Sequence, residues 1–358
     1  MQPTKLKRIK TAVLASSKSM GLFSAMGRSR WRTDRLLILG YHGISIDDEH
    51  LWNPALYMSQ DALARRLELL VGNNCSVLPL RQAVDRLARN DLPPRSVAIT
   101  FDDGSYDFAV RAHPVIQEFG VPVTVYQTSY YSTFNRPIFD VACSYILWKG
   151  AAQRLDGEPF TGTAGLLDLH TADRRAAVCR RIRQTMLRDG RSAQEKDVLL
   201  DRLAEALGVD IASMRKNRVL HLMTPAELRR VASAGVDLQL HTHRHRVPMN
   251  RELFLAEIAD NRRFLADIGQ PSTDHFCYPS GAYDAAFLPW LAEAGVRAAT
   301  TCDPGLATRT SPPLLLPRII DSSSLSDVEF EGWLYGVSDV LPHRPVQRSV
   351  ALTAESTR

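Results

Sequence analysis

The chain is poor in cysteine and has no thiol motif. It contains five cysteines in 358 residues, and no two of them form a Cys-x-x-Cys pair. The missing pair argues against a thiolate zinc site, and the odd number argues against a disulfide framework. We expect free thiols in a reducing compartment, mostly buried as small hydrophobic side chains. These residues are Cys75, Cys143, Cys179, Cys277 and Cys302.

Long hydrophobic runs are also absent. No stretch reaches the roughly 18 consecutive apolar residues that a transmembrane helix needs. The segment 11–23 follows a basic start, but Ser16, Ser17, Lys18 and Ser19 interrupt it, which makes a poor signal-peptide core. We therefore expect a cytoplasmic protein.

Negative charge is nearly missing from the first 35 residues. Nine Lys and Arg side chains stand there against Asp34 alone, in a chain with a formal net charge of +5. We expect a basic N-terminal arm over 1–35, suited to peripheral contact with the anionic inner membrane or with an acidic glycan. A solvated arm is the alternative, and we expect no nucleic-acid partner.

The rest of the chain has the composition of a globular protein with a large core. Hydrophobic residues make up 45% and charged residues 23%. Strand-like runs alternate with helical patterns, as in parallel βα units. The expected strands lie at 36–42, 77–78, 97–99, 121–126, 236–240, 276–278, 297–302 and 314–320.

This alternation predicts an α/β fold, a distorted (β/α) barrel of seven to eight strands over residues 36–340. An open sheet is the alternative. Between about 130 and 220 the pattern is helical, with helices expected at 174–187 and 193–207 and no clear strand. We interpret this stretch as a helical insertion that covers the cleft and sets specificity, and residues 341–358 as a flexible tail.

Polar residues that can do chemistry follow several of the expected strands. They are His42, the pair Asp102-Asp103, His241, and Tyr278-Pro279. A (β/α) barrel places its catalytic residues at the carboxyl ends of its strands, so we expect these groups to share one mouth.

Two carboxylates and two imidazoles without a nearby thiol match the ligands of a hydrolytic Zn, Mn, Fe or Co site. His241 and His245 can reach one ion if the loop curls, and one of Asp102 and Asp103 completes the set. The other carboxylate can take a proton from water whose pKa the metal lowers to about 7. Taken singly, an Asp-Asp pair is more often a turn or a helix cap, and a His-x-x-x-His pair is more often a coincidence.

Three motifs together resemble the polysaccharide deacetylases of carbohydrate esterase family 4, which share the NodB homology domain. Thr100-Phe101-Asp102-Asp103-Gly104 resembles their first motif and His241-Thr242-x-x-His245 their second. Phe276-Cys277-Tyr278-Pro279-Ser280-Gly281 resembles the third, in the form seen in the branch of exopolysaccharide and surface-glycan enzymes. Tyr41-His42-Gly43 resembles the opening strand of that branch, and the similarity spans about 36–128 and 222–320.

The resemblance implies a distorted barrel that hydrolyses an acetyl group on a sugar with a divalent metal. Zinc is the first expectation, with Mn, Co, Fe or Ni as alternatives. The implied roles are Asp102 as general base, Asp103, His241 and His245 as metal ligands, and the backbone N–H near Ser280 as oxyanion donor. Tyr278, Pro279 and Arg318 are the expected substrate-binding residues, with Pro279 fixing the turn.

The sequence also departs from the family pattern. Phe276 stands at or near the place of an Arg that orients the base, the Asp-x-x-Asp-Trp motif is missing, and Leu341-Pro342-His343 does not reproduce the late Leu-x-x-His motif. We therefore expect His42 to serve as general acid; a structural histidine bonded to backbone is the alternative. His243 should point away from the metal. For Arg318, contact with an anionic part of the substrate, contact with a site carboxylate and a plain salt bridge all stay open.

Three functions remain open. The leading one is a metal-dependent N-deacetylase acting on a glycan or glycan precursor. The second keeps the barrel and the metal but takes a small amide or imide, and the third is a non-catalytic glycan-binding protein. Aromatic side chains able to stack on a sugar, each also suited to core packing, are Trp52, Tyr106, Tyr130, Tyr131, Trp148 and Tyr283.

Overall fold

The computed structural model describes residues 5–150 and 153–342. Its centre is a curled parallel sheet in the order β11-β10-β9-β6-β5-β1-β12, with β4 attached to β5. Thr300 at the end of β11 forms one parallel bridge to Leu316, which lies in the segment before β12. The expected distorted barrel is therefore confirmed, with seven strands in the row. Its strands are β1 (37–41), β4 (76–77), β5 (96–101), β6 (124–127), β9 (237–240), β10 (275–277), β11 (298–300) and β12 (319–320).

The strand sequences explain why these segments lie at the centre. All residues of β1 and β5 are buried, as expected for strands covered on both faces. Ile38, Ala98 and Cys277 belong to an inner cluster to which one helix, α6 (80–89), adds Leu80 and Leu87. A larger cluster packs the outer face of the sheet against the surrounding helices.

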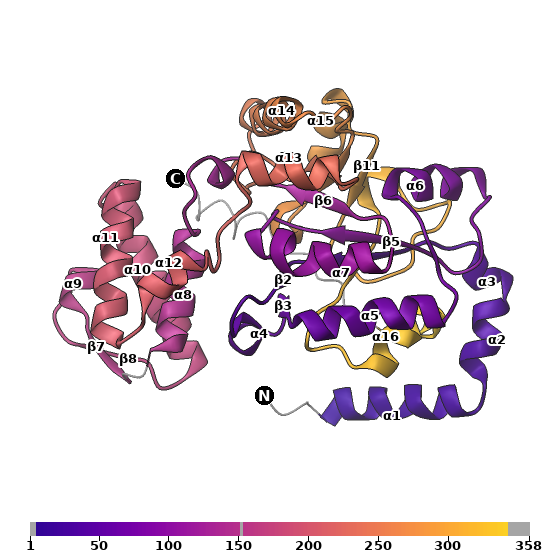
Figure 1. Cartoon of the computed structure of the whole chain (residues 1–358), viewed down its shortest axis with the longest axis horizontal. Helices are drawn as coiled ribbons and strands as arrows, with labels where there is room; N and C mark the ends of the chain where they lie inside the picture. Colours follow the sequence, from indigo (N-terminus) through magenta and orange to yellow (C-terminus); the bar gives the residue numbers. More distant parts are fainter. Residues whose placement is uncertain (1–4, 151–152, 343–358) are drawn as a thin grey trace.

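The helices around the barrel follow the expected alternation. They are α5 (60–72), α6, a π-helical turn (108–112) running into α7 (113–118), α13 (225–233), α14 (251–268), α15 (287–293) and α16 (327–334). Shorter elements are β2 (43–44), α4 (49–52), β3 (57–58) and the 3-10 turns at 131–133, 279–281, 313–315 and 337–340. Figure 1 shows α13, α14 and α15 on one side of the sheet and α5 and α16 on another.

The helical insertion forms a lobe beside the barrel (Figure 1). Its helices are α8 (139–149), α9 (158–161), α10 (172–188), α11 (193–207) and α12 (211–216), and they bury a separate apolar cluster. The expectation of no strand was wrong, because β7 (154–156) and β8 (166–168) pair as an antiparallel hairpin. Strands of three residues are too short for a two-residue period to reveal them.

The basic N-terminal segment is helical and packs on the body, so the described part is not a solvated arm. It consists of α1 (5–19), α2 (22–28) and α3 (30–33). Leu14 and Phe23 are buried, and Lys18 pairs with Glu331 of α16 at 2.5 Å. Arg32 is fully buried and donates hydrogen bonds to three backbone carbonyls, those of Leu334, Arg35 and Ser96.

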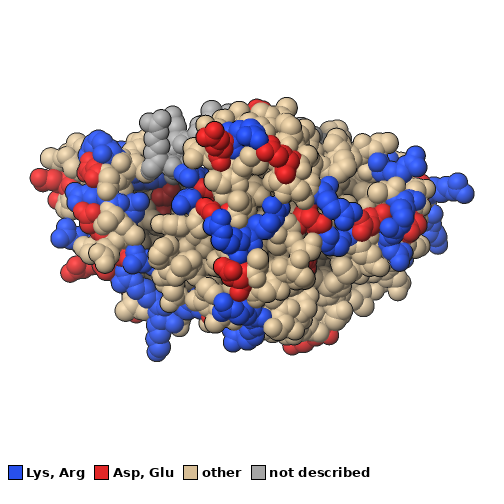
Figure 2. Space-filling model, turned by 90° about the horizontal axis from the view of Figure 1, so that it is seen from above, with Lys and Arg blue, Asp and Glu red and all other residues tan. Residues whose placement is uncertain are grey.

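The remaining features are the absence of a membrane-crossing helix in the described residues, the C-terminal end and the surface charge. No helix among residues 5–150 and 153–342 is long and apolar enough to cross a membrane. The expected flexible tail lies, from residue 343 on, outside the described residues. On the face seen in Figure 2, basic and acidic side chains are interspersed, so this face is neither uniformly positive nor uniformly negative.

Candidate metal centre and active site

The site begins where β5 delivers two adjacent carboxylates to the mouth of the barrel. Asp102 donates its backbone N–H to the Tyr41 carbonyl, and Asp103 follows with a left-handed φ of 68°. Gly104 also has a positive φ, and a Cβ there would lie 1.8 Å from the Gln127 side-chain oxygen. Only glycine fits this turn, which sends the two carboxylates in different directions.

Asp103 faces both histidines of the second motif. Its Oδ1 atom lies 3.2 Å from His241 Nε2 and 3.1 Å from His245 Nε2. His241 Nδ1 lies 2.9 Å from the Cys277 carbonyl. A carbonyl can only accept, so Nδ1 carries a proton, and Nε2 is the nitrogen that faces Asp103. Burial would raise the pKa of Asp103, but the two histidines hold it well below its ordinary value.

These three groups can hold one cation. Their ligand atoms all lie within 4.8 Å of one another. Asp102, His241 and Cys277 satisfy the same distance criterion, but their atoms are engaged elsewhere. Burial raises the pKa of the Cys277 thiol, so it stays protonated, and Asp102 is paired with an arginine. The chemistry therefore favours Asp103, His241 and His245.

Asp102 is held by Arg318, which enters from the segment before β12. Nη1 and Nη2 of Arg318 lie 2.7 and 2.5 Å from the two carboxylate oxygens. The Arg318 side chain is fully buried and also donates to the Thr301 carbonyl. Burial would raise the pKa of Asp102, but the charge and hydrogen bonds of Arg318 lower it, so the carboxylate is ionised.

This contact corrects the expectation that Arg318 binds substrate. A guanidinium with no exposed surface and two bonds to Asp102 positions that carboxylate instead. It does what the missing third-motif arginine would do. Phe276 cannot do so, because it faces the outer helices and packs against Phe254 of α14.

His42 lies beside the same carboxylate. Its Nε2 atom is 3.6 Å from Asp102 Oδ2, while its buried Nδ1 has no hydrogen-bond partner among the described residues. The alternative of a histidine bonded to backbone is therefore not what the structure has. Burial lowers the pKa of His42, which favours the neutral imidazole. Its role as general acid remains a prediction.

A cavity of about 290 Å³ opens beside two of these groups. His42 and Asp103 both line it, and Trp52, Tyr57 and Asp140 contribute other parts of the wall. The cavity brings a predicted acid and a predicted ligand to one space large enough for a sugar ring with its acetamido group.

The third motif reaches the site through its backbone. Tyr278 is fully buried and its hydroxyl donates to the Leu314 carbonyl, and Pro279 is buried as well. The expectation that these two side chains bind substrate is therefore wrong. Phe276 of β10 and Tyr278 directly after it alternate with Cys277, so both aromatic rings belong to the outer cluster while Cys277 belongs to the inner one. Ser280 has a φ of 57°, and within residues 5–150 and 153–342 its N–H donates no backbone hydrogen bond.

Several residues at and near the candidate metal ligands have strained backbone conformations. Besides Asp103, the residues Thr242, His245 and Ser280 have φ values of 63°, 55° and 57°. Each such residue costs on the order of 1–3 kcal/mol and persists only when its surroundings enforce it. Four of them around one mouth indicate a geometry that the rest of the fold maintains.

Sequence reasoning missed the residues that maintain it. Asn261 of α14 accepts from the His241 N–H and donates to the Gln127 carbonyl. Glu257, one turn earlier, is buried and binds the guanidinium groups of Arg244 and Arg246. Two polar residues spaced i and i+4 on the buried face of an amphipathic helix were the available signal. His243 points away from the ligands, as expected, toward Ser129 Oγ at 2.8 Å.

The aromatic candidates divide into two groups. Trp52 lines the cavity at the mouth, and Tyr130 and Tyr131 line a second, larger one. The other three have structural partners: Tyr106 lies against Arg218, Trp148 against Tyr145, and Tyr283 bonds to Asp303.

Comparison with known proteins gives a family match over part of the chain and a fold. The family model described as polysaccharide deacetylase matches residues 183–299, which include the second and third motifs but not Asp102 and Asp103. No curated protein sequence matches the chain.

Solved structures match over most of the chain. The Streptococcus pyogenes deacetylase PplD, solved with acetate, is 18% identical with a TM-score of 0.54, covering 86% of this chain and 99% of its own. IcaB from Ammonifex degensii is 16% identical with a TM-score of 0.51, covering 85% and 98%. BC0361, a polysaccharide deacetylase from Bacillus cereus, is 17% identical with a TM-score of 0.50, covering 84% and 69%. The expected resemblance and the expected fold are both confirmed.

Proposed function

From the match to polysaccharide deacetylases and the geometry of the mouth, we propose that this protein is a metal-dependent hydrolase that removes an acetyl group from an N-acetylated sugar of a glycan or glycan precursor. One observation carries the proposal. Asp103 lines the cavity and faces two imidazole Nε2 atoms, while its chain neighbour Asp102 is held ionised by Arg318.

The residues at the mouth fit a divalent ion. A carboxylate oxygen and two imidazole nitrogens are the ligands of catalytic zinc sites that leave a position open, and His241 is already oriented by a carbonyl. Asp103, His241 and His245 would hold the ion. Zinc fits this set best, and Mn, Co, Fe or Ni are the alternatives.

A bound ion would supply Lewis acidity, polarising the acetyl carbonyl and making water a stronger acid. Asp102 would take the proton of the attacking water, since Arg318 keeps it ionised and fixed in orientation. The Ser280 N–H would donate to the oxyanion of the tetrahedral intermediate. Asp102 would pass the proton taken from water to His42, whose Nε2 lies 3.6 Å from Asp102 Oδ2, and His42 would deliver it to the nitrogen that leaves.

The arrangement of these groups bears differently on the two other functions. A non-catalytic glycan-binding protein has no need for an ionised buried carboxylate beside a ligand set. A hydrolase of small amides or imides would use the same groups, so substrate choice must separate it from a sugar deacetylase.

The test is a substrate screen on protein purified, stripped with a chelator and reloaded with zinc. We expect the zinc-loaded protein to release acetate from N-acetylglucosamine oligomers. This activity should be lost when the metal is stripped and should return when zinc is added back. Small acyclic amides and cyclic imides serve as comparison substrates. Cleavage of the small amides alone would point to the second function. No cleavage of any substrate by zinc-loaded protein would point to the third.

We further propose that the protein works at the inner face of the cytoplasmic membrane and touches it through α1. The outward face of this helix exposes Ile9 and Val13 by 61 and 47%, with Arg8 and Lys10 beside them, and Met20 directly after the helix is 68% exposed. Apolar and basic side chains on one helix suit an anionic bilayer surface. Flotation with phosphatidylglycerol vesicles should recover the protein, and Ile9→Glu should reduce the recovery. Equal recovery with neutral phosphatidylcholine vesicles would contradict the electrostatic part.

A further inference from the structure

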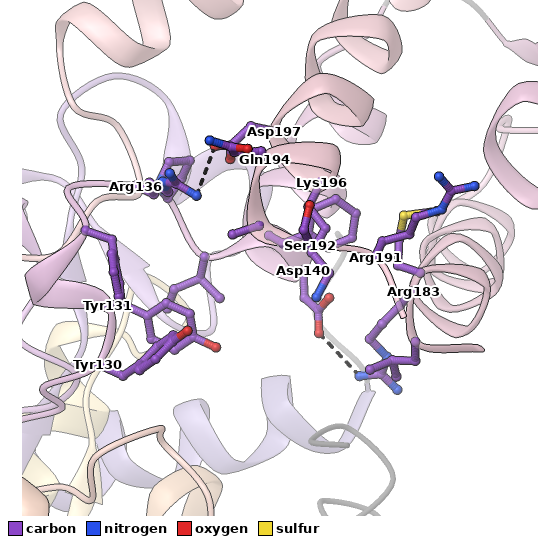
Figure 3. A pocket seen from close by; sticks show the side chains of 17 residues that line it. Tyr130, Tyr131, Arg136, Asp140, Arg183, Arg191, Ser192, Gln194, Lys196 and Asp197 are labelled. Carbon is purple, nitrogen blue, oxygen red and sulfur yellow. Dashed lines mark ion pairs between the residues drawn. The ribbon is translucent and has the colours of Figure 1, made fainter. Parts of the chain in front are cut away.

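A second cavity of about 600 Å³ lies between the segment that follows β6 and the helices of the insertion. Figure 3 shows Tyr130 and Tyr131 on one side of it, with Arg183, Arg191 and Lys196 of the α10–α11 region on the other. Its volume is within the roughly 300–1,000 Å³ typical of small-ligand sites.

This cavity is joined to the catalytic mouth at two points. Asp140 of α8 lines both cavities. The Tyr130 N–H donates to the His243 carbonyl at 2.8 Å, so the tyrosine wall is attached to the loop that carries His241 and His245. A ligand longer than one sugar could therefore occupy both spaces.

One wall of the cavity is aromatic. The Tyr130 and Tyr131 rings are perpendicular at 5.2 Å, and Phe134 lies 5.1 Å from Tyr130 and is half exposed. Aromatic side chains with an apolar face and a polar end suit a sugar ring, which presents C–H groups and hydroxyls.

The opposite wall is cationic. Four cationic side chains line the cavity against two carboxylates, Asp140 and Asp197. Arg136 pairs with Asp197 at 3.4 Å, so Asp140 is the one other carboxylate in the lining. Arg191 also pairs at 2.8 Å with Glu195, which lies outside the lining, so Arg183 and Lys196 carry most of the charge that a ligand would meet.

Arg183 keeps one nitrogen available for a ligand. Its Nη1 is 3.6 Å from Asp140 Oδ2, longer than a hydrogen bond, and its buried Nε has no partner among the described residues. A buried donor without a partner is costly unless a ligand supplies the acceptor.

We propose that this cavity is a second saccharide subsite that binds a sugar carrying a phosphate or a carboxylate. The sugar ring would pack on Tyr130 and Tyr131, and its anionic group would bind Arg183, Arg191 and Lys196. The inference rests on the proposed function in one respect: it makes the preferred substrate an anionic glycan, with the acetylated unit at the mouth and the acidic unit here.

Calorimetry on the zinc-loaded protein tests the subsite without relying on catalysis. The probes are N-acetylglucosamine 1-phosphate, glucuronic acid, neutral N-acetylglucosamine and inorganic phosphate. At least one acidic sugar should bind about tenfold more tightly than the neutral sugar, as expected for a charge-assisted hydrogen bond. The phosphate and carboxylate probes identify which anion the site takes.

Variants place the binding in this cavity. Arg183→Gln and Lys196→Gln should each remove most of the preference for the acidic sugar. Arg181→Gln is the matched control, because Arg181 is exposed on the same helix and does not line the cavity. Equal affinity for acidic and neutral sugars, inorganic phosphate binding as tightly as the sugar phosphate, or an unchanged preference in both variants would each overturn the subsite.

The kinetic arm separates this inference from the proposed function. The ratio of kcat/KM for an acidic over a neutral acetylated oligosaccharide should be about ten or more and fall toward one in Arg183→Gln. No acetate from any sugar would defeat the proposed function, and the binding result would still decide the subsite. Acetate release with a ratio near one in the unaltered protein would defeat the subsite and leave the deacetylase intact.

Discussion

The mouth of the barrel and the helical insertion are built in opposite ways. The mouth joins side chains from residues 42, 102–103, 241–245 and 318, which come from four distant segments tied by buried hydrogen bonds. The insertion is one continuous segment around its own apolar cluster. The first arrangement can hold atoms to a fixed geometry for chemistry, and the second can change without disturbing it. Substitutions should therefore separate the two regions.

The largest effect should come from the two adjacent aspartates. Asp102→Asn should lower kcat by roughly 10²–10⁴ and keep the metal, because the side chain transfers a proton and does not ligate. Asp103→Asn should lose metal and activity together. Metal content by mass spectrometry alongside acetate release checks both. Equal metal loss in the two variants would mean that the roles are shared or reversed.

Arg318→Lys should be nearly as damaging. Lysine cannot form the two parallel bonds to Asp102, and breaking a buried pair costs about 3–5 kcal/mol of the free energy of unfolding. We expect a lower denaturation midpoint and a lower kcat in protein that still folds. The matched control is Arg65→Lys, an exposed arginine whose change should alter neither quantity. Full activity in Arg318→Lys would show that the reaction does not need Arg318 to position Asp102.

His42→Ala tests the general acid. The variant should keep its metal and lose much of its kcat on amides, because an amine leaves poorly without a proton. An ester substrate should suffer less, since an alkoxide leaves more readily. The ratio of amide to ester rates is the readout, and an unchanged ratio would assign the proton to another group.

Leu203→Ala tests the independence of the insertion. Leu203 is 1% exposed in the separate cluster of α11, so its truncation should cost about 2–5 kcal/mol of local stability. Hydrogen exchange should speed up across α8, α10 and α11, while zinc content stays that of the unaltered protein. Loss of zinc in this variant would show that the two regions are coupled.

The last effect is a pH dependence of stability near the mouth. Burial raises the pKa of Asp107 to about 7, although its carboxylate accepts from the Ile44 N–H and the Ser105 hydroxyl. The native state then holds its proton more tightly than the unfolded state, so the free energy of unfolding falls as pH rises from about 4 to about 7. Asp107→Asn should remove up to about 4 kcal/mol of that fall. Parallel denaturation profiles of the two proteins across this range would contradict the buried-acid assignment.

The sequence indicated the barrel and most of the mouth because both leave local signals. Apolar runs mark the strands, and Asp-Asp-Gly and His-x-x-x-His mark the ends of two of them. For Arg318 the sequence left contact with a site carboxylate as one of three alternatives, because it is 216 residues from Asp102 and meets it only in the folded sheet. Tyr278 was misassigned because a motif specifies which residues are present but does not specify the side of the strand toward which each side chain points. Glu257 and Asn261 were missed because a polar residue on a helix usually faces solvent.

X-ray absorption at the metal edge of the zinc-loaded protein tests the central claim most directly. Ligation by Asp103, His241 and His245 predicts a first shell of nitrogen and oxygen at about 2.0–2.2 Å, with imidazole scattering and no sulfur. Asp103→Asn should abolish the signal, and Cys277→Ser should leave it unchanged. A sulfur shell at about 2.3 Å, lost in Cys277→Ser, would place the metal at Asp102, His241 and Cys277 and contradict the account.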